Sequence, residues 1–222
     1  MLGAAVLCSE QGSEAQRQWR DFPPPLARPL PQGLTRFSLA AALGGQARVA
    51  ADWAYIDSLQ YLGEVKNQAD GRFQKTLRLY SEVLWLDPAF RHAGRQGIAV
   101  LGWFMHRPLE AAQLARQAMA ADPKEVRYPA YYGALGYQEK LDPAGVVEAL
   151  RPEVMRPDAP EMLLRIVGNV YLKARDWDGA LKYWGWIRRR SRDPMTLREA
   201  EQGIRKARAE LQAGIPPAPG KR

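Results

Sequence analysis

The stretch Phe73-Gln-Lys-Thr-Leu-Arg-Leu-Tyr-Ser-Glu-Val-Leu-Trp-Leu-Asp-Pro88 contains the two features that decide the fold. Its apolar residues Leu77, Tyr80 and Leu84 recur at intervals of three and four, which is the period of an amphipathic helix. The stretch then stops at an Asp-Pro pair, where proline is expected because it cannot continue a helix. The pattern predicts a helix that ends just before Pro88.

The same break recurs along the chain at nearly constant spacing. Pro123, Pro160 and Pro194 follow Pro88 at intervals of 35, 37 and 34 residues, and Pro123 and Pro194 also stand in Asp-Pro pairs. The segments between the breaks carry apolar residues three or four apart, and none shows the alternation of period two that a strand requires. A period near 34 residues with two helices per unit predicts an all-α solenoid of helical hairpins.

The unit resembles the tetratricopeptide repeat (TPR) family, whose repeat has 34 residues. The small, aromatic and proline positions of that family are matched in the second and last units by Ala111, Ala118 and Pro123, and by Gly168, Tyr171, Ala180 and Trp184. The resemblance covers residues 48–194 and implies about four repeats, with residues 195–212 as a capping helix. The third unit departs most, because Pro129, Pro143, Pro152 and Pro157 are expected to perturb its helices.

Proline-rich segments flank the predicted repeat domain of residues 35–212, at residues 1–34 and 213–222. The first holds five prolines between Phe22 and Pro31, so we expect an extended arm that is mobile in the isolated protein and orders against a partner. The run Met1-Leu-Gly-Ala-Ala-Val-Leu-Cys8 allows two interpretations, the remnant of a signal or anchor and a frayed apolar N-terminus. No apolar run is long enough to cross a bilayer.

Residues 50–63 and the unit that follows them are similar to a group of bacterial envelope-associated repeat proteins, which usually begin with a membrane anchor. This resemblance implies a place in the bacterial cell envelope, either periplasmic or membrane-associated. A cytoplasmic location is the alternative.

The chain offers few residues for chemistry. Among its 222 residues are one cysteine, Cys8, and two histidines, His92 and His106. A single cysteine excludes an intrachain disulfide and a metal site built on several thiolates. The sequence has no phosphate-binding loop, dinucleotide fingerprint, nucleophile elbow or zinc-protease motif. We therefore expect no catalytic residue, metal ligand, cofactor or small-molecule substrate.

The TPR resemblance implies a groove for a partner polypeptide, lined by the first helix of each unit. The groove positions that it implies lie in the third and last units: Arg127, Ala130, Ala134 and Tyr137, and Met162, Arg165, Asn169 and Leu172. Stacked repeats would hold such a groove rigid, which lowers the ordering cost of binding. The expected function is a non-catalytic scaffold or adaptor, a subunit of a larger multi-protein complex.

Positive charge is concentrated near the C-terminus. The chain has 32 Lys and Arg against 24 Asp and Glu, a net charge of +8, and residues 178–222 contribute 11 basic and 5 acidic residues, hence +6. We predict a docking patch formed by Trp186, Arg188, Arg189, Arg190 and Arg192, with Trp186 as an exposed anchor because it lies two residues after Trp184. An alternative function is a peripheral module that binds anionic lipid or nucleic acid through this face. Nucleic acid ranks lower, because no reading module is visible.

Overall fold

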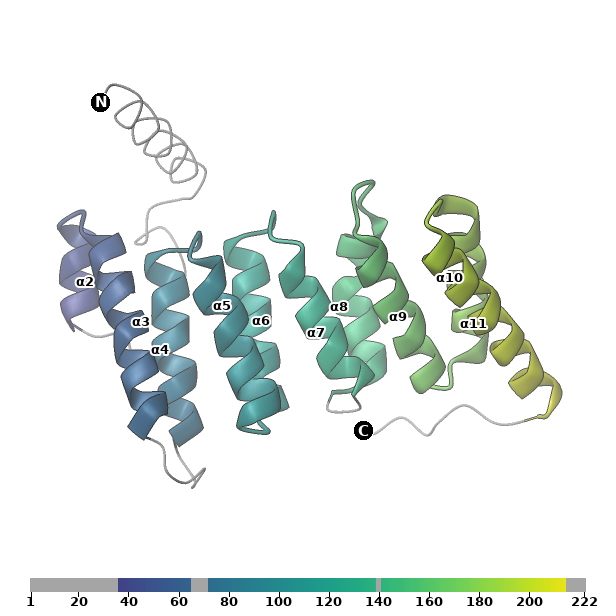
Figure 1. Ribbon diagram of the computed structural model, residues 1–222, viewed down its shortest axis with the longest axis horizontal. Helices are drawn as coiled ribbons and strands as arrows, with labels where there is room; N and C mark the ends of the chain where they lie inside the picture. Colours follow the sequence, from purple (N-terminus) through teal and green to yellow (C-terminus); the bar gives the residue numbers. More distant parts are fainter. Residues whose placement is uncertain (1–35, 65–71, 139–140, 215–222) are drawn as a thin grey trace, which may run out of the picture.

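The computed structural model describes residues 36–64, 72–138 and 141–214 (Figure 1). No strand occurs in these ranges, which confirms the all-α prediction. The predicted arm of residues 1–34 and most of the predicted tail of residues 213–222 lie outside the described residues.

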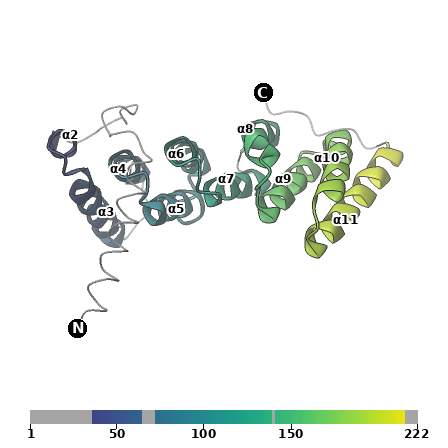
Figure 2. The same cartoon turned by 90° about the horizontal axis from the view of Figure 1, so that it is seen from above.

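The described elements are α2 (Arg36–Leu43), α3 (Ala47–Glu64), α4 (Arg72–Leu86), α5 (Arg91–Ala99), the π-helix η2 (Val100–Phe104), α6 (Pro108–Ala121), α7 (Arg127–Tyr137), α8 (Pro143–Met155), α9 (Glu161–Lys173), α10 (Trp177–Arg190) and α11 (Pro194–Gln212). They lie in two layers (Figure 2). We call α3, α5, α7, α9 and α11 the odd layer, and α2, α4, α6, α8 and α10 the even layer. Helices adjacent in the chain pack together, and α7 and α9 pack side by side within the odd layer. The helices therefore form an elongated, solenoid-like row from α2 to α11.

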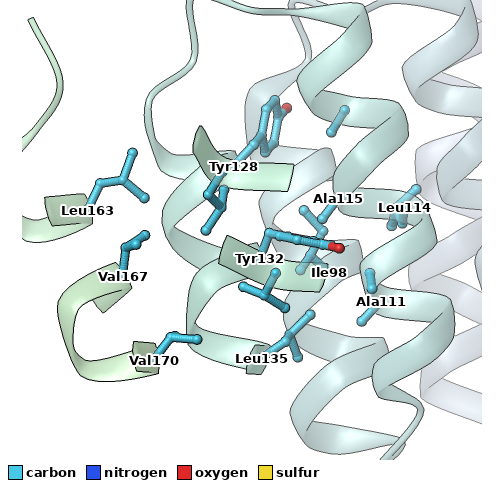
Figure 3. Close-up of a cluster of buried hydrophobic side chains, with 14 of the residues drawn as sticks. Ile98, Ala111, Leu114, Ala115, Tyr128, Tyr132, Leu135, Leu163, Val167 and Val170 are labelled. Carbon is cyan, nitrogen blue, oxygen red and sulfur yellow. The ribbon is translucent and has the colours of Figure 1, made fainter. Parts of the chain in front are cut away.

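One continuous apolar core joins the layers. Ile98 of α5, Leu114 of α6 and Leu135 of α7 are fully buried in it (Figure 3). In the same cluster, Leu163 and Val167 of α9 face α7. Each hairpin thus buries its apolar side chains against the next, and dense packing along the row stabilises the whole array.

Trp184 of α10 is fully buried between two glycines on neighbouring helices. A Cβ atom added at Gly168 of α9 or at Gly203 of α11 would overlap the indole. Gly168 and Trp184 are two of the positions that the TPR resemblance singled out. Gly203 makes an equivalent contact from the other side, at a position that the sequence pattern did not single out.

The Asp-Pro pairs break the chain in two ways. Asp87-Pro88 and Asp122-Pro123 directly follow the ends of α4 and α6. Asp193-Pro194 begins a helix: the Asp193 carboxylate accepts a hydrogen bond from the backbone N–H of Thr196, and Pro194 takes the first helical position of α11. Proline suits that position because the N–H that it lacks would have no partner within the helix.

The four prolines of the third unit perturb its helices less than expected. Pro143 begins α8, and Pro129 lies in the first turn of α7, where a missing N–H breaks no helical hydrogen bond. Pro152 lies inside α8, yet the helix continues to Met155. The unit keeps two helices.

A substitution at Ala180 tests the packing of α10. Ala180 is fully buried, whereas Ala213 is exposed at the end of α11. We expect Ala180→Leu to lower the free energy of unfolding by about 1–3 kcal/mol, because it overpacks a filled core. Ala213→Leu should leave it nearly unchanged. Thermal melts followed by circular dichroism would measure both, and equal melting temperatures would show that the packing assigned to Ala180 is wrong.

Candidate interaction surfaces

The structure places the predicted groove residues on adjacent helices of the odd layer. Arg127 and Tyr137 of α7 are exposed, and so is Met162 of α9. Arg165, Asn169, Leu172 and Ala134 are half-buried. Ala130 is buried in the core, so its expected position in a groove is wrong. It points away from solvent because α7 turns that side toward its neighbours.

Arg165 and Asn169 are already engaged with the α11 region. The Arg165 guanidinium lies 3.4 Å from the Asp193 carboxylate and 3.6 Å from that of Glu199, and the Asn169 amide donates to Glu199 at 3.4 Å. Hydrogen bonds from Thr196, and then the charge of Arg165, hold the pKa of Asp193 below its ordinary value. These two side chains therefore tie α9 to α11 as well as facing the surface.

Two aromatic residues outside the predicted groove positions, Trp103 and Tyr131, contact each other between the π-helix η2 and α7. The helix α5 changes to a π-helix at Val100, and the Met105 N–H donates to the Val100 carbonyl at 2.8 Å. Trp103 in this π-helix packs edge-on against Tyr131 of α7, with ring centroids 6.0 Å apart. π-helical turns are frequent at functional sites. The sequence pattern did not predict this π-helix.

We call four partly exposed apolar side chains of these helices the odd-layer band: Trp103, Tyr131, Tyr137 and Met162. Tyr137 ends α7 beside Lys173 at the end of α9, whereas Met162 lies in the first turn of α9, so the band extends along the length of the two helices. Tyr137 and Met162 are 45% and 48% exposed, and Trp103 and Tyr131 are half-buried. The Lys173 ammonium lies 5.6 Å from the Tyr137 ring centroid. Arg127, which is exposed at the start of α7, adds a second cation. The band combines partly exposed apolar surface with positive charge, on helices held in place by the core.

The predicted docking patch is only partly available. Arg188, Arg189 and Arg192 are exposed. The expectation that Trp186 is an exposed anchor is wrong, because it is half-buried, packs beside Tyr183, and is covered by the Arg190 guanidinium at 4.8 Å.

Arg190 itself closes the end of the neighbouring helix α8. Its guanidinium donates to the Val154 carbonyl at 2.7 Å and also to the Arg156 carbonyl. These carbonyls lie at the helix C-terminus, where no amide of α8 can satisfy them, so a cation there is favourable. Arg190 lies next to Arg188 and Arg189 in the sequence. Its hydrogen-bond partners are instead the carbonyls of Val154 and Arg156, at the end of α8.

Removing the Arg190 guanidinium tests this structural role. We expect Arg190→Met to lower the free energy of unfolding by about 2 kcal/mol, because hydrogen bonds from a charged group to partly buried carbonyls are lost. Arg188→Met, on the same helix and exposed, is the matched control and should change stability by less than about 0.5 kcal/mol. Urea titrations of both variants measure the difference. Equal effects would contradict a role in joining α10 to α8.

In comparisons with known proteins, no family model, curated protein or solved structure matches this chain. Within the described ranges, no three His, Cys, Asp or Glu side chains gather as they would around a metal ion. No described helix combines the length and apolar character needed to span a bilayer.

Proposed function

We propose that this protein is a non-catalytic, TPR-like scaffold that binds a partner polypeptide along its odd layer. In this proposal α3–α4, α5–α6, α7–α8 and α9–α10 are four repeats, and α11 is the capping helix. The packing of Trp184 between Gly168 and Gly203 supports the assignment, because such small-to-large contacts allow close helix stacking. The charged outer side of α11 suits a cap.

The observation that carries the proposal is the odd-layer band. Tyr137 and Met162 are anchored on neighbouring helices whose opposite sides are buried in the core, so their positions are set before a partner arrives. Partly exposed aromatic side chains of this kind provide most of the binding energy at protein interfaces. Burial of a partner segment across α7 and α9 is the proposed mechanism, and the rigid helices lower its entropic cost.

The proposed role is that of an adaptor subunit within a larger assembly. The similarity of residues 50–63 to bacterial envelope-associated repeat proteins supports a place at the cell envelope, and the proline-rich segment 1–34 would then act as a tether.

Site-specific photocrosslinking in cells of the source organism tests the proposal. A benzophenone side chain is introduced at Met162 or, as the matched control, at Gln113, which is exposed on α6 of the even layer. We expect the Met162 position to capture a discrete protein that the Gln113 position does not. Tyr137→Ala, combined with the benzophenone at Met162, should reduce that adduct at least tenfold, because the partner loses its anchor at the other end of the α7–α9 pair. Equal capture at both positions, or no effect of Tyr137→Ala, would reject binding along the odd layer.

A second candidate function rests on the remaining exposed arginines. Arg188, Arg189 and Arg192 follow one another closely, and α11 exposes four more cations: Arg198, Arg205, Lys206 and Arg208. Such a cluster attracts an acidic protein or an anionic membrane surface. Sedimentation with phosphatidylglycerol vesicles distinguishes this function, because electrostatic binding falls steeply between 50 and 500 mM salt whereas apolar anchoring does not. The triple change of Arg188, Arg189 and Arg192 to Glu should abolish it, and Arg190 stays unchanged because its role is structural.

A further inference from the structure

The two ends of the helical row differ in chemistry. At the C-terminal end, α11 turns a charged and polar side outward. At the N-terminal end, α2 and α3 expose seven large apolar side chains, and five of them are between 43% and 67% accessible: Phe37, Leu43, Val49, Trp53 and Ile56. A repeat array normally needs a polar surface at each end to stay soluble. An apolar end of this size indicates an interface.

The exposed residues of α3 follow the spacing of a helix–helix seam. Val49, Trp53, Ile56 and exposed Gln60 are separated by four, three and four residues, so they form one stripe along the helix. The exposed carboxylates Asp52 and Asp57 flank the stripe and provide a polar rim. The opposite side of α3, which includes Ala47, Ala51 and Ser58, is buried against the rest of the protein. The stripe is thus a second helix-packing surface, in addition to the one that α4 occupies.

We propose that the stripe binds the same stripe of a second copy, with the two α3 helices antiparallel about a two-fold axis. In that register Trp53 packs beside Ile56 of the other copy, and Val49 lies beside Gln60. The large indole of one copy then meets the smaller side chain of the other, which makes the stripe complementary to itself, as a two-fold interface requires.

Two physical arguments favour a second copy bound in this way. Head-to-tail stacking would place the arginine-rich side of α11 against the apolar stripe and desolvate these charges, so contact between two N-terminal ends is favoured. The proposed interface includes Phe37 and Leu43 of α2 as well as the stripe. With roughly 100 Å² exposed on each of the five apolar side chains, two copies would bury about 1,000 Å² in total, the lower limit for a specific interface. A concentration-dependent dimer is therefore expected.

Sedimentation velocity of the full-length protein tests the proposal directly. The parent should change from monomer to dimer between 1 and 100 μM, the concentration range typical of an interface of roughly this minimal size. Trp53→Ser should raise the dissociation constant at least tenfold while keeping the parent's helical circular dichroism, because the side chain is 61% exposed. Leu109→Ser removes an equally exposed apolar side chain, at 68%, from α6 and should leave dimerisation unchanged.

The antiparallel register has its own test. In a Cys8→Ser background, Val49→Cys and Gln60→Cys proteins are prepared separately, then mixed and oxidised. We expect the mixture to form the Val49–Gln60 heterodisulfide, and neither protein alone to form a disulfide dimer efficiently. A parent that stays monomeric up to 100 μM, or a dimer that Trp53→Ser leaves intact, overturns the proposal. Efficient Val49–Val49 disulfides would overturn the antiparallel register.

Discussion

Replacing Arg91 with methionine should lower the free energy of unfolding by about 3 kcal/mol, because two buried carboxylates lose their main counterion. The Arg91 Nε atom lies 2.7 Å from Oδ2 of Asp122 and 3.4 Å from Oε2 of Glu125. Those side chains are only 1% and 8% exposed. The hydrogen bond to Asp122 raises the pKa of Arg91 above its ordinary value, so the guanidinium stays charged.

The remaining cation cannot replace it. Arg95 contacts only Glu125, at 3.9 Å, so Asp122 would keep no positive partner in the described part of the chain. Breaking a buried ion pair from one side typically costs 3–5 kcal/mol, and we take the lower end, about 3 kcal/mol, because Arg91 is itself partly exposed.

Urea unfolding followed by circular dichroism measures this prediction. Arg127→Met is the matched control, since Arg127 is exposed on the next helix of the odd layer and should change stability by less than about 0.5 kcal/mol. The double variant Arg91→Met with Asp122→Asn should recover part of the loss, because one uncompensated charge disappears with its partner. A single variant as stable as the control would show that the network contributes no stability.

Arg91 is one case of a contact that repeats along the row. An arginine of an odd-layer helix reaches the aspartate of the Asp-Pro pair that closes the same hairpin: Arg48 with Asp87 at 4.0 Å, Arg91 with Asp122 at 2.7 Å, and Arg165 with Asp193 at 3.4 Å. In the third hairpin Ala159 precedes Pro160 in place of aspartate. The Asp-Pro pairs therefore mark a helix boundary and also anchor the turn to the odd layer.

Gly203→Ala is the second change expected to have a large effect, a loss of about 2–3 kcal/mol or more in the free energy of unfolding. The added methyl would overlap the Trp184 indole, which is fully buried and held from its other side at Gly168. Neither helix can retreat without opening the packing between α9, α10 and α11. The intrinsic gain of about 1 kcal/mol from replacing a helical glycine with alanine is too small to offset this.

Gly185→Ala provides the control on the same hairpin. The nearest atom to its added methyl is the flexible Arg189 guanidinium, at 3.9 Å, so this variant should be slightly more stable than the parent. Gly168→Ala should resemble Gly203→Ala, because it meets the same indole. Melting temperatures that rise for all three variants would show that Trp184 is not tightly enclosed.

The local sequence pattern alone was sufficient to predict the helices. The three- and four-residue spacing of Leu77, Tyr80 and Leu84 depends only on the period of an α-helix, and the Asp-Pro breaks depend only on the missing N–H of proline. Both are properties of neighbouring residues. For this reason the all-α class and the ends of α4 and α6 follow from the sequence.

Only the tertiary structure decided which helix sides are covered. Trp186 and Trp53 both lie in helices, yet Arg190 and Tyr183 cover Trp186 while Trp53 stays exposed at the end of the row. The bond from Arg190 to Val154 and the contact of Gly203 with Trp184 likewise join different helices. Periodicity identifies an apolar side of a helix but contains no information about its neighbour, because that neighbour is set by stacking between units.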